Sequence, residues 1–468
     1  MKRNLFLMPF LLGMALCACS LAPEYTRPAA PVPGEWPAGE AYKDARPATA
    51  ADAELQWKEC FLDTKLQQVI EVALRNNRDL RLAALNARKV RALYGIQRAE
   101  LFPTVNATGG MVKERIPADL SSSGKSMTAE QYSVSLGVAS WEIDFFGRIR
   151  SLEDQALQEY LATEQARRSV HISLISGIAS AYLTLAADRA NLQLARFTLE
   201  AQQASYTLIR KRFEAGLATE LDLRRAQTQV DTARGNVARY TQLTALDRNA
   251  LDLLAGAPVP EELLPADLSR VTPPKDISPG LSSEVLLNRP DIMAAEHRLK
   301  GAYAYIGAAR AAFFPRISLT SSIGTASAEL SGLFGAGSTT WSFVPRISIP
   351  IFDARTWAAL RVSKADREII LTQYEKTIQT AFREVADALA IRGTVDQRLA
   401  AQQSLVDAVS ETYRLSNKRY TMGVDSYLGV LDAQRMLYAA QEGLIVLQLT
   451  RLINRVTLYN VLGGSKEQ

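Results

Sequence analysis

The sequence contains few of the residues that bind metals, form disulfides or carry out acid–base catalysis. It has three cysteines and two histidines, His171 and His297, among 468 residues. Two histidines cannot build a histidine-rich metal site, and no serine–histidine–aspartate set is indicated. The stretch at residues 335–338, Gly-Ala-Gly-Ser, lacks the lysine of a phosphate-binding loop. We therefore expect no enzymatic activity, no metal and no cofactor.

A strong excess of one charge sign is also missing. The 54 basic and 49 acidic residues leave a formal charge of +5, and no basic run stands out. Nucleic-acid-binding proteins concentrate lysine and arginine on one face, so we expect no nucleic-acid partner.

Long uncharged stretches are scarce. Val170–Ala187 is uncharged apart from His171, but it contains three serines and a threonine and lies inside a longer helical pattern. This composition favours a buried helix of a bundle over a membrane-spanning helix.

The N-terminus has the pattern of an export signal. Two basic residues precede the apolar stretch Leu5–Leu16, which is too short to span a bilayer. Leu16–Cys19 then matches a bacterial lipobox, so we expect residues 1–18 to be a lipoprotein signal peptide and Cys19 to carry acyl chains such as palmitate. Several chains give stable membrane anchoring. Ser20 favours the outer membrane, by resemblance to such lipoproteins. The alternative is a plain secretory signal that happens to end in cysteine.

The mature chain begins with a proline-rich segment. Residues 19–60 have no hydrophobic period, and we interpret them as a lipid anchor followed by an extended tether. After cleavage and lipidation Cys60 is the one remaining thiol, so no disulfide framework is expected.

Two similar 22-residue stretches occur, at Tyr206–Gln227 and at Tyr413–Gln434. Both copies read as a helix, a turn at Gly216 or Gly423, and a second helix. Apolar residues recur every seven positions around the first turn, at Leu192, Leu199, Tyr206 and Phe213 and then at Leu223, Val230 and Val237, with counterparts 207 residues later. A seven-residue apolar period is typical of a coiled coil, and glycine supplies the positive φ of a helix end. We predict two long antiparallel helical hairpins with tips near residues 216 and 423.

The repeat extends beyond the hairpins. Residues 78–103 align without a gap with residues 290–315, and each stretch is followed by alternating apolar and small polar residues. The alternation predicts strands at about 103–117 and 129–146, and again at about 315–327 and 339–352. A first repeat, 61–256, is thus separated from a second repeat, 281–468, by a proline-rich linker, 257–280.

The predicted strands require an assembly of chains. Four strands of this length approach what a tilted membrane strand needs, but four cannot close a barrel. An open sheet edge in lipid leaves backbone groups unpaired, so the barrel must be completed by other copies. Two, three or four copies supply eight, twelve or sixteen strands, and the spacing does not choose among them.

Several motifs resemble one family. They are the lipobox, Glu142–Arg148, Asn288–Asp291, Ile306–Pro315 and Leu431–Gln434. Together with the duplicated plan of helix, two strands and helices, they resemble the outer membrane factor family, which is TolC-like. The chain is most similar to the lipoprotein channels of resistance-nodulation-division (RND) drug efflux systems, over essentially the whole mature sequence.

This resemblance implies a fold and an activity. The fold is mostly α with a membrane β-barrel part: a homotrimer whose 12-stranded β-barrel is continuous with a long periplasmic α-helical barrel, with residues 257–280 in an equatorial region. The implied function is a passive outer membrane exit duct for drugs and other amphiphilic small molecules. It extends into the periplasm and docks to a periplasmic membrane-fusion adaptor and an inner-membrane RND transporter.

The resemblance also implies a periplasmic gate at the hairpin tips. Leu428 and Asp432 are four residues apart and share a helix face, so threefold copies would form an apolar constriction and an acidic ring. Arg435 is a partner for a tip carboxylate, and Asp222 with Tyr420 resembles the family's inter-hairpin hydrogen-bonded pair. Opening then means outward movement of the second hairpin's tip.

The tip glycines, Gly216 and Gly423, together with Arg212 and Arg419 are implied contacts for the adaptor. Two neighbouring positions depart from the family pattern: Gly429 stands where a second carboxylate ring occurs, and Asp425 where the archetype has a basic residue.

Two other functions stay open. One is an exit duct for type I protein secretion or for another class of pump. The other is a non-conducting coiled-coil lipoprotein that spaces the envelope. Alternating strands with small residues on one face favour a duct over a spacer.

Overall fold

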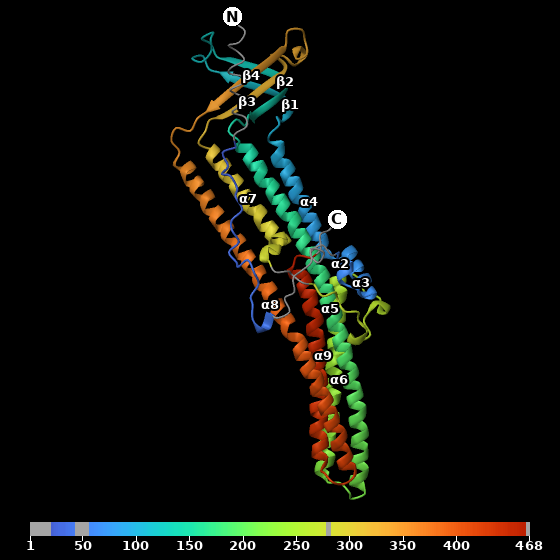
Figure 1. Ribbon diagram of the computed structural model, residues 1–468. Coiled ribbons are helices and arrows are strands. Elements are labelled where there is room, and N and C mark those ends of the chain that lie inside the picture. Colours follow the sequence, from blue (N-terminus) through green and yellow to red (C-terminus); the bar gives the residue numbers. More distant parts are fainter. Residues whose placement is uncertain (1–19, 43–55, 278–281, 465–468) are drawn as a thin grey trace. The chain divides into compact units, whose positions relative to one another are not determined.

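The structure is a computed structural model that describes residues 20–42, 56–277 and 282–464 (Figure 1). The predicted signal peptide and the predicted lipidation site at Cys19 lie outside these residues. The α-helices and strands are α2 (Trp57–Cys60), α3 (Thr64–Asn76), α4 (Arg78–Ala99), β1 (Val105–Ile116), β2 (Met127–Glu142), α5 (Arg148–Glu214), α6 (Glu220–Ala255), α7 (Pro290–Ala311), β3 (Arg316–Ser327), β4 (Thr339–Ser348), α8 (Ala354–Thr421) and α9 (Tyr427–Val461). Short 3-10 helices are η1 (Glu40–Tyr42), η3 (Glu261–Leu263), η4 (Leu268–Arg270), η5 (Ser283–Asn288) and η6 (Leu330–Gly332).

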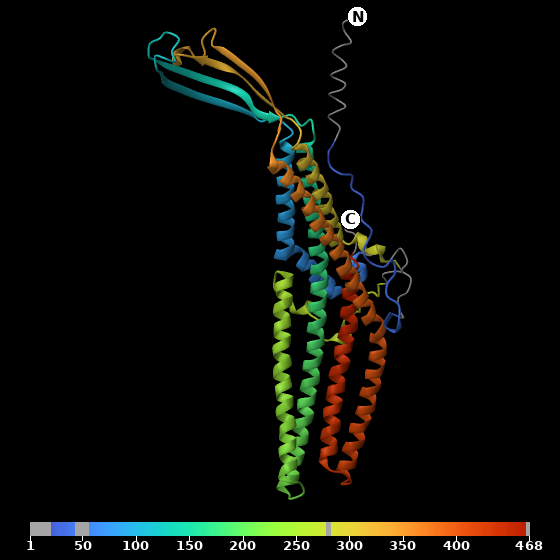
Figure 2. The ribbon, with the colours of Figure 1, turned by 90° about the vertical axis from the view of Figure 1, so that its left-hand side faces the viewer.

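The two halves of the chain repeat the same order of elements. Helices α4 and α7 both contain 22 residues, and each is followed by two strands and a long helical hairpin. The hairpin α5–α6 pairs helices of 67 and 36 residues, and α8–α9 pairs helices of 68 and 35 (Figure 2). The duplication predicted from the sequence is therefore a duplication of structure.

The chain forms two compact units. Among the described residues, the first contains 20–29, 86–164 and 294–374, and so includes the four strands. The second contains 30–42, 56–85, 165–277, 282–293 and 375–464, with both hairpin tips.

The four strands form one antiparallel sheet in the order β1-β2-β3-β4. The register of the strands places apolar side chains mainly on one face of the sheet and small polar side chains on the other. Rows on one face include Ala107–Leu136–Ile323–Trp341 and Val105–Val138–Ser321–Phe343. Rows on the other include Asn106–Gly137–Ser322–Ser342 and Thr108–Ser135–Gly324–Thr340. One face is thus mainly apolar and the other small and polar, as the alternation predicts.

Close strand packing on the polar face depends on glycine. A Cβ at Gly324 would lie 2.2 Å from the Val134 carbonyl oxygen, and one at Gly137 would lie 2.6 Å from that of Ser321. These separations are shorter than contact distance, so larger residues cannot occupy either position without moving a strand.

Strand β2 contains a β-bulge just before Trp141. The pairing of β2 with β3 slips between Val138 and Trp141, and Ser140 adopts φ of +53° there. The Ser140 N–H donates to the Thr320 hydroxyl over 3.1 Å. An extra residue in one strand exchanges the faces of the residues after it, so the apolar residues of β2 change from even positions up to Val138 to the odd position of Trp141.

Two strands end before the predicted limits. Strand β2 ends at Glu142, because the Phe145 N–H bonds to the Ile143 carbonyl and turns the chain toward Gly147, whose φ is +73°. Strand β4 ends at Ser348, four residues before the predicted limit.

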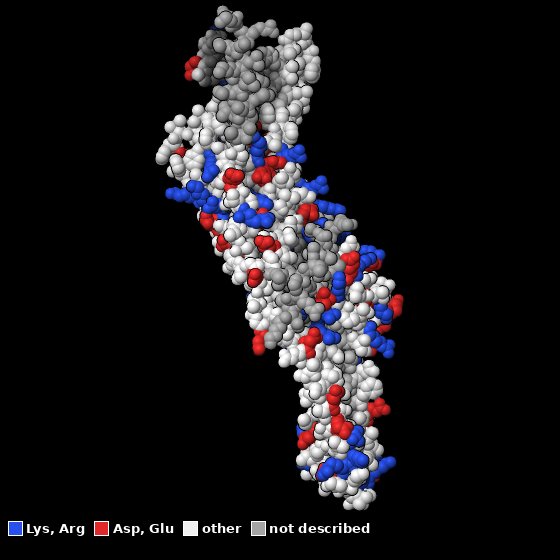
Figure 3. Space-filling model, viewed as in Figure 1, with Lys and Arg blue, Asp and Glu red and all other residues white. Residues whose placement is uncertain are grey.

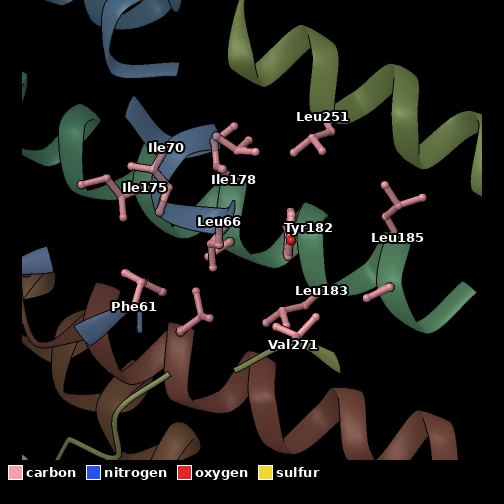
Figure 4. Packing of buried hydrophobic residues seen from close by; sticks show 14 of the residues in the cluster. Phe61, Leu66, Ile70, Ile175, Ile178, Tyr182, Leu183, Leu185, Leu251 and Val271 are labelled. Carbon is pink, nitrogen blue, oxygen red and sulfur yellow. The ribbon is translucent and has the colours of Figure 1, made fainter. Parts of the chain in front are cut away.

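A large hydrophobic core lies in the second unit (Figure 4). Helix α3 contributes apolar residues at helical spacing, including Leu66, Val69 and Ile70, and α5 contributes Ile175 and Tyr182. Part of α5 is long and apolar enough to span a membrane, but 61% of that window is buried. The stretch at 170–187 is therefore a core helix, as its serine content predicts.

The proline-rich segments are packed rather than loose. In the 257–280 region, Val259, Leu264, Leu268, Val271 and Ile277 are buried in this core. At the N-terminal end of the chain, side chains of the tether make contacts within each unit. Arg27 pairs with the buried Glu296 at 2.7 Å, and Trp36 stacks on Phe382 with ring centroids 5.1 Å apart.

The Asn288–Asp291 motif has a structural role. Arg289, 8% exposed, forms ion pairs with Asp291 at 2.8 Å and Glu384 at 2.9 Å. It also donates to the Val461 carbonyl at the end of α9 over 2.7 Å. The motif therefore ties the start of α7 to α8 and α9.

Candidate functional site

The tips of the two hairpins have the same backbone geometry. Gly216 follows α5 with φ of +71°, and Gly423 follows α8 with φ of +74°. In both, the N–H of the next residue reaches back to an arginine carbonyl, that of Arg212 or Arg419. No atom lies within 4 Å of a Cβ added at either glycine, so the positive φ rather than crowding requires glycine here.

The first tip is closed by a capping box. The Thr219 hydroxyl accepts from the Asp222 N–H, and the Asp222 carboxylate accepts from the Thr219 N–H and hydroxyl. This reciprocal pair satisfies two backbone donors at the start of α6. Asp222, predicted to pair with Tyr420, is thus engaged with its own helix, and the described contacts include no bond between these two residues.

The second tip is held differently. Arg419 and Asp425 form an ion pair across the Gly423 turn, with one nitrogen–oxygen contact of 3.1 Å. The Arg419 guanidinium lowers the pKa of the Asp425 carboxyl. Ser426 begins α9 without a side-chain capping bond. The two hairpins therefore have the same kind of glycine turn, but only the first has a side-chain cap at the start of its return helix.

An apolar cluster joins the four helices behind the tips. Its buried members are Ile209, Ala226, Tyr427, Val430 and Leu431, with Tyr206, Leu223, Tyr413 and Tyr420 packed against them. These residues include the heptad positions read from the sequence, and they come from α5, α6, α8 and α9. The seven-residue apolar period thus joins the two hairpins to each other.

A polar relay lies beside this cluster. Gln202 of α5 donates to Gln434 of α9 over 3.0 Å, and Gln434 donates to the Tyr413 hydroxyl over 3.1 Å. Both glutamines are at most 8% exposed. Buried amides that are hydrogen-bonded fix the register of packed helices, so this relay sets how the hairpins align.

Arg212 and Tyr420 link the two tips. The Arg212 guanidinium lies 5.1 Å from the centroid of the Tyr420 ring, and that ring packs against Tyr427 at 5.2 Å. Burial raises the pKa of Tyr427 to about 12, so its hydroxyl stays neutral. Arg212 and Arg419, the predicted adaptor contacts, therefore both have partners within the chain.

The predicted gate residues lie on the first turns of α9. Leu428 is 42% exposed, whereas its neighbours Tyr427, Val430 and Leu431 are buried. Asp432 and Arg435 form the ion pair that their spacing predicts, and both side chains are at least half exposed. Leu428, Asp432 and Arg435 are therefore not used in the core between the hairpins and are available to another chain.

Charged side chains gather at the hairpin ends (Figure 3). Basic residues end both long helices, with Lys211 and Arg212 on α5 and Lys418 and Arg419 on α8. Cations at a helix C-terminus interact favourably with its dipole, which accounts for part of this pattern without a partner. Among the described residues no group of three or more histidine, cysteine, aspartate or glutamate side chains could hold a metal ion.

Comparison with known proteins identifies the family. The family described as "Outer membrane efflux protein" matches residues 69–257 and 281–464. The chain is 48% identical over 459 residues to the toluene efflux pump outer membrane protein TtgC of Pseudomonas putida, covering 97% of this chain and 93% of that protein.

Solved structures agree with this match. The chain resembles a membrane protein from Pseudomonas aeruginosa with a TM-score of 0.90 and 42% identity, covering 96% of this chain and 98% of the other. It also resembles the open state of the Neisseria gonorrhoeae outer membrane channel MtrE, with a TM-score of 0.85, 38% identity and coverages of 95% and 98%. The chain therefore belongs to the outer membrane efflux protein family, the TolC-like channels that serve as outer membrane components of efflux pumps.

Proposed function

We propose that three copies of this chain form the exit duct of a tripartite pump. The observation that carries the proposal is the four-stranded sheet, whose outer strands β1 and β4 each lack a neighbour on one side. Unpaired strand edges cannot persist in lipid, so each edge needs the opposite edge of another copy. Three copies give a closed 12-stranded barrel, the number implied by the resemblance to TolC-like channels.

The register supports a water-filled barrel. The apolar face includes Trp341 and Phe343, which are 76% and 62% exposed within the chain and would meet lipid. The opposite face carries serine, threonine and glycine, which are too small to fill a wide interior. A barrel with this pattern conducts small solutes passively.

The gate belongs to the second hairpin tip. In a trimer, the exposed side chain of Leu428 would form an apolar constriction, and the Asp432–Arg435 pairs a charged ring. The start of α9 supports movement there, because the Ser426 side chain makes no capping bond to it. Opening then consists of outward movement of the Gly423 turn and α9, stabilised by a periplasmic adaptor at Gly216, Gly423, Arg212 and Arg419.

The cargo and partners follow from the relatives. We infer export of drugs and other amphiphilic small molecules, including apolar solvents, because a protein 48% identical over its length is named for toluene efflux. The same likeness supports a periplasmic membrane-fusion adaptor and an inner-membrane RND transporter as partners. Acyl chains on Cys19, palmitate among them, would add a lipid anchor in the outer membrane.

Single-channel recording tests the gate. We expect the wild-type protein in a planar bilayer to show small, mostly closed currents. The double variant Asp432→Ala/Arg435→Ala should show open currents several-fold more often, since an exposed ion pair contributes about 0.2–1 kcal/mol and a trimer would contain three of them.

The matched control is Asp231→Ala/Arg234→Ala. This pair has the same spacing and similar exposure but lies on α6. Equal opening in both double variants would refute the gate assignment. Folded oligomers that conduct in neither variant would favour the envelope-spacer function. Conduction without any change in drug sensitivity, in a strain that lacks its own duct, would favour a protein-secretion duct or another pump class.

A further inference from the structure

A small polar cavity lies in the second unit, apart from the tips and the sheet. Its volume is about 140 Å³. It is lined by side chains of α8, α9 and the segment before α7, chiefly Arg392, Arg451, Arg455, Asp276, Asp396 and Asn454. One water occupies about 30 Å³ in the liquid, so the cavity has room for a few waters or one small oxyanion.

The three guanidinium groups differ in how well they are paired. Arg392 is well satisfied, with Asp276 at 3.0 Å and the Ile277 carbonyl at 3.3 Å. Among the described contacts, Arg455 has only the neutral carbonyl of Pro274, at 2.8 Å. The charge of Arg455 therefore has no carboxylate beside it.

Arg451 is also incompletely paired. Its Nη1 lies 3.4 Å from Asp396, which is long for a charge-assisted bond. Its Nε is buried and has no hydrogen-bond acceptor among the described residues. A buried donor without an acceptor is uncommon in folded proteins, and an unseen water or ion is a usual explanation.

The arrangement suits an anion. Three arginines face two aspartates, which leaves one positive charge in a recess. Arg451 and Arg455 are four residues apart and project from the same face of α9. Guanidinium groups bind phosphate and carboxylate through two parallel N–H donors, and both arginines have donors left for this.

We propose that this cavity binds one small oxyanion per chain, a phosphate or a carboxylate group. Arg451 and Arg455 supply the direct contacts, and Arg392, held by Asp276, supplies a fixed positive charge at the wall. Asp396 competes with the anion for Arg451. The site lies near the C-terminal end of α9, whereas Leu428, Asp432 and Arg435 lie near its start.

Calorimetric titration of the full-length protein in detergent tests the proposal, with inorganic phosphate and succinate as separate probes. We expect saturable binding of at least one probe at one site per chain. Arg451→Gln and Arg455→Gln should each weaken binding about tenfold or more, the usual effect of losing a charge-assisted bond. The control Arg398→Gln removes the same charge from an exposed position of α8 and should leave binding unchanged.

A second variant changes binding in the opposite direction. Asp396→Asn removes the competing carboxylate and should tighten binding several-fold. Because it strengthens binding, its result cannot be explained by misfolding. Binding of phosphate alone or succinate alone supports the site and identifies its ligand. Absence of binding by both probes, or equal loss in Arg398→Gln, would overturn the proposal, as would weaker binding in Asp396→Asn.

Discussion

At the scale of single residues, Cys60 carries a thiol of low reactivity. It is buried and unpaired, and burial raises its pKa to about 11. The thiolate is the reactive form, so Cys60 should react only when the fold opens.

Thiol labelling checks this together with the lipidation proposed at Cys19. We expect no modification of the folded protein by N-ethylmaleimide at pH 7.5, and one modified cysteine per chain after denaturation. Two modified cysteines would show that Cys19 has a free thiol, and three that the signal peptide is retained. Rapid labelling of the folded protein would contradict the burial of Cys60.

Arg289 is a residue whose loss should be costly. Arg289→Met removes a buried cation from two carboxylates and a helix-end carbonyl, leaving Asp291 and Glu384 without it. Because the carboxylates of Asp291 and Glu384 are 39% and 35% exposed, the cost should fall below the about 3–5 kcal/mol of a fully buried pair. Thermal unfolding followed by circular dichroism should show a clear drop in midpoint. The control Arg383→Met removes an exposed arginine of α8, 72% accessible, and should change stability by less than about 1 kcal/mol. Equal midpoints in the two variants would contradict this role.

Pairs of residues within one helix could be predicted from the sequence, and pairs across a turn could not. Asp432 and Arg435 are three apart, so helical geometry places them together. Arg419 and Asp425 are six apart with a glycine turn between them, and no periodic rule relates them. The resemblance implies a bond between Asp222 and Tyr420, whereas the carboxylate of Asp222 bonds Thr219, three residues earlier, at shorter range in the chain. The signal for that cap, Thr-x-x-Asp, is present in the sequence at residues 219–222.

At the scale of elements, α5 and α6 face each other through two carboxyl groups. Burial, and then the neighbouring Asp188, raise the pKa of Asp247 to about 6. A folded-state pKa above the unfolded value means that this site stabilises the fold at low pH. That contribution is lost as the pH rises through about 6.

The variant Asp247→Asn should therefore stabilise the protein near neutral pH, by about 1 kcal/mol after allowance for solvent screening. At pH 3.5, below the unfolded value of 3.8, the difference from wild type should nearly vanish. Unfolding midpoints measured at both pH values check this. Asp231→Asn, at an exposed position of the same helix, is the control. A gain that is equal at the two pH values would contradict the raised pKa of Asp247.

Element types were predictable because their periods are long and consistent. The heptads of both hairpins and the alternation of the strands each repeat, and every feature occurs twice in the chain. Element ends were less predictable, since they depend on single contacts such as the turn from Ile143 to Phe145. The packing of the 257–280 region also escaped prediction. Its buried residues Val259, Leu264 and Leu268 have no regular period and are recognised only when the core they enter is known.

At the scale of the whole molecule, the prediction concerns the number of copies. Native mass spectrometry of the detergent-extracted protein should give the mass of three chains, because two or four copies would make a barrel of eight or sixteen strands. A dimer or tetramer would refute the 12-stranded barrel. It would not affect the assignment of the chain to the outer membrane efflux protein family. The number of copies could not be derived from spacing, since every even closure satisfies the open edges equally well.

The unequal caps of the two tips have a mechanical consequence. In a ring of three chains, six hairpins would alternate around the circumference. Three start their return helix in a closed capping box at Thr219, and three start it at Ser426 with no such bond. The ring of hairpin tips then alternates between stiff tips, which have the capping box, and more flexible tips, which do not. A force applied evenly around it would be taken up at three hinges rather than six, and the aperture would widen as a triangle.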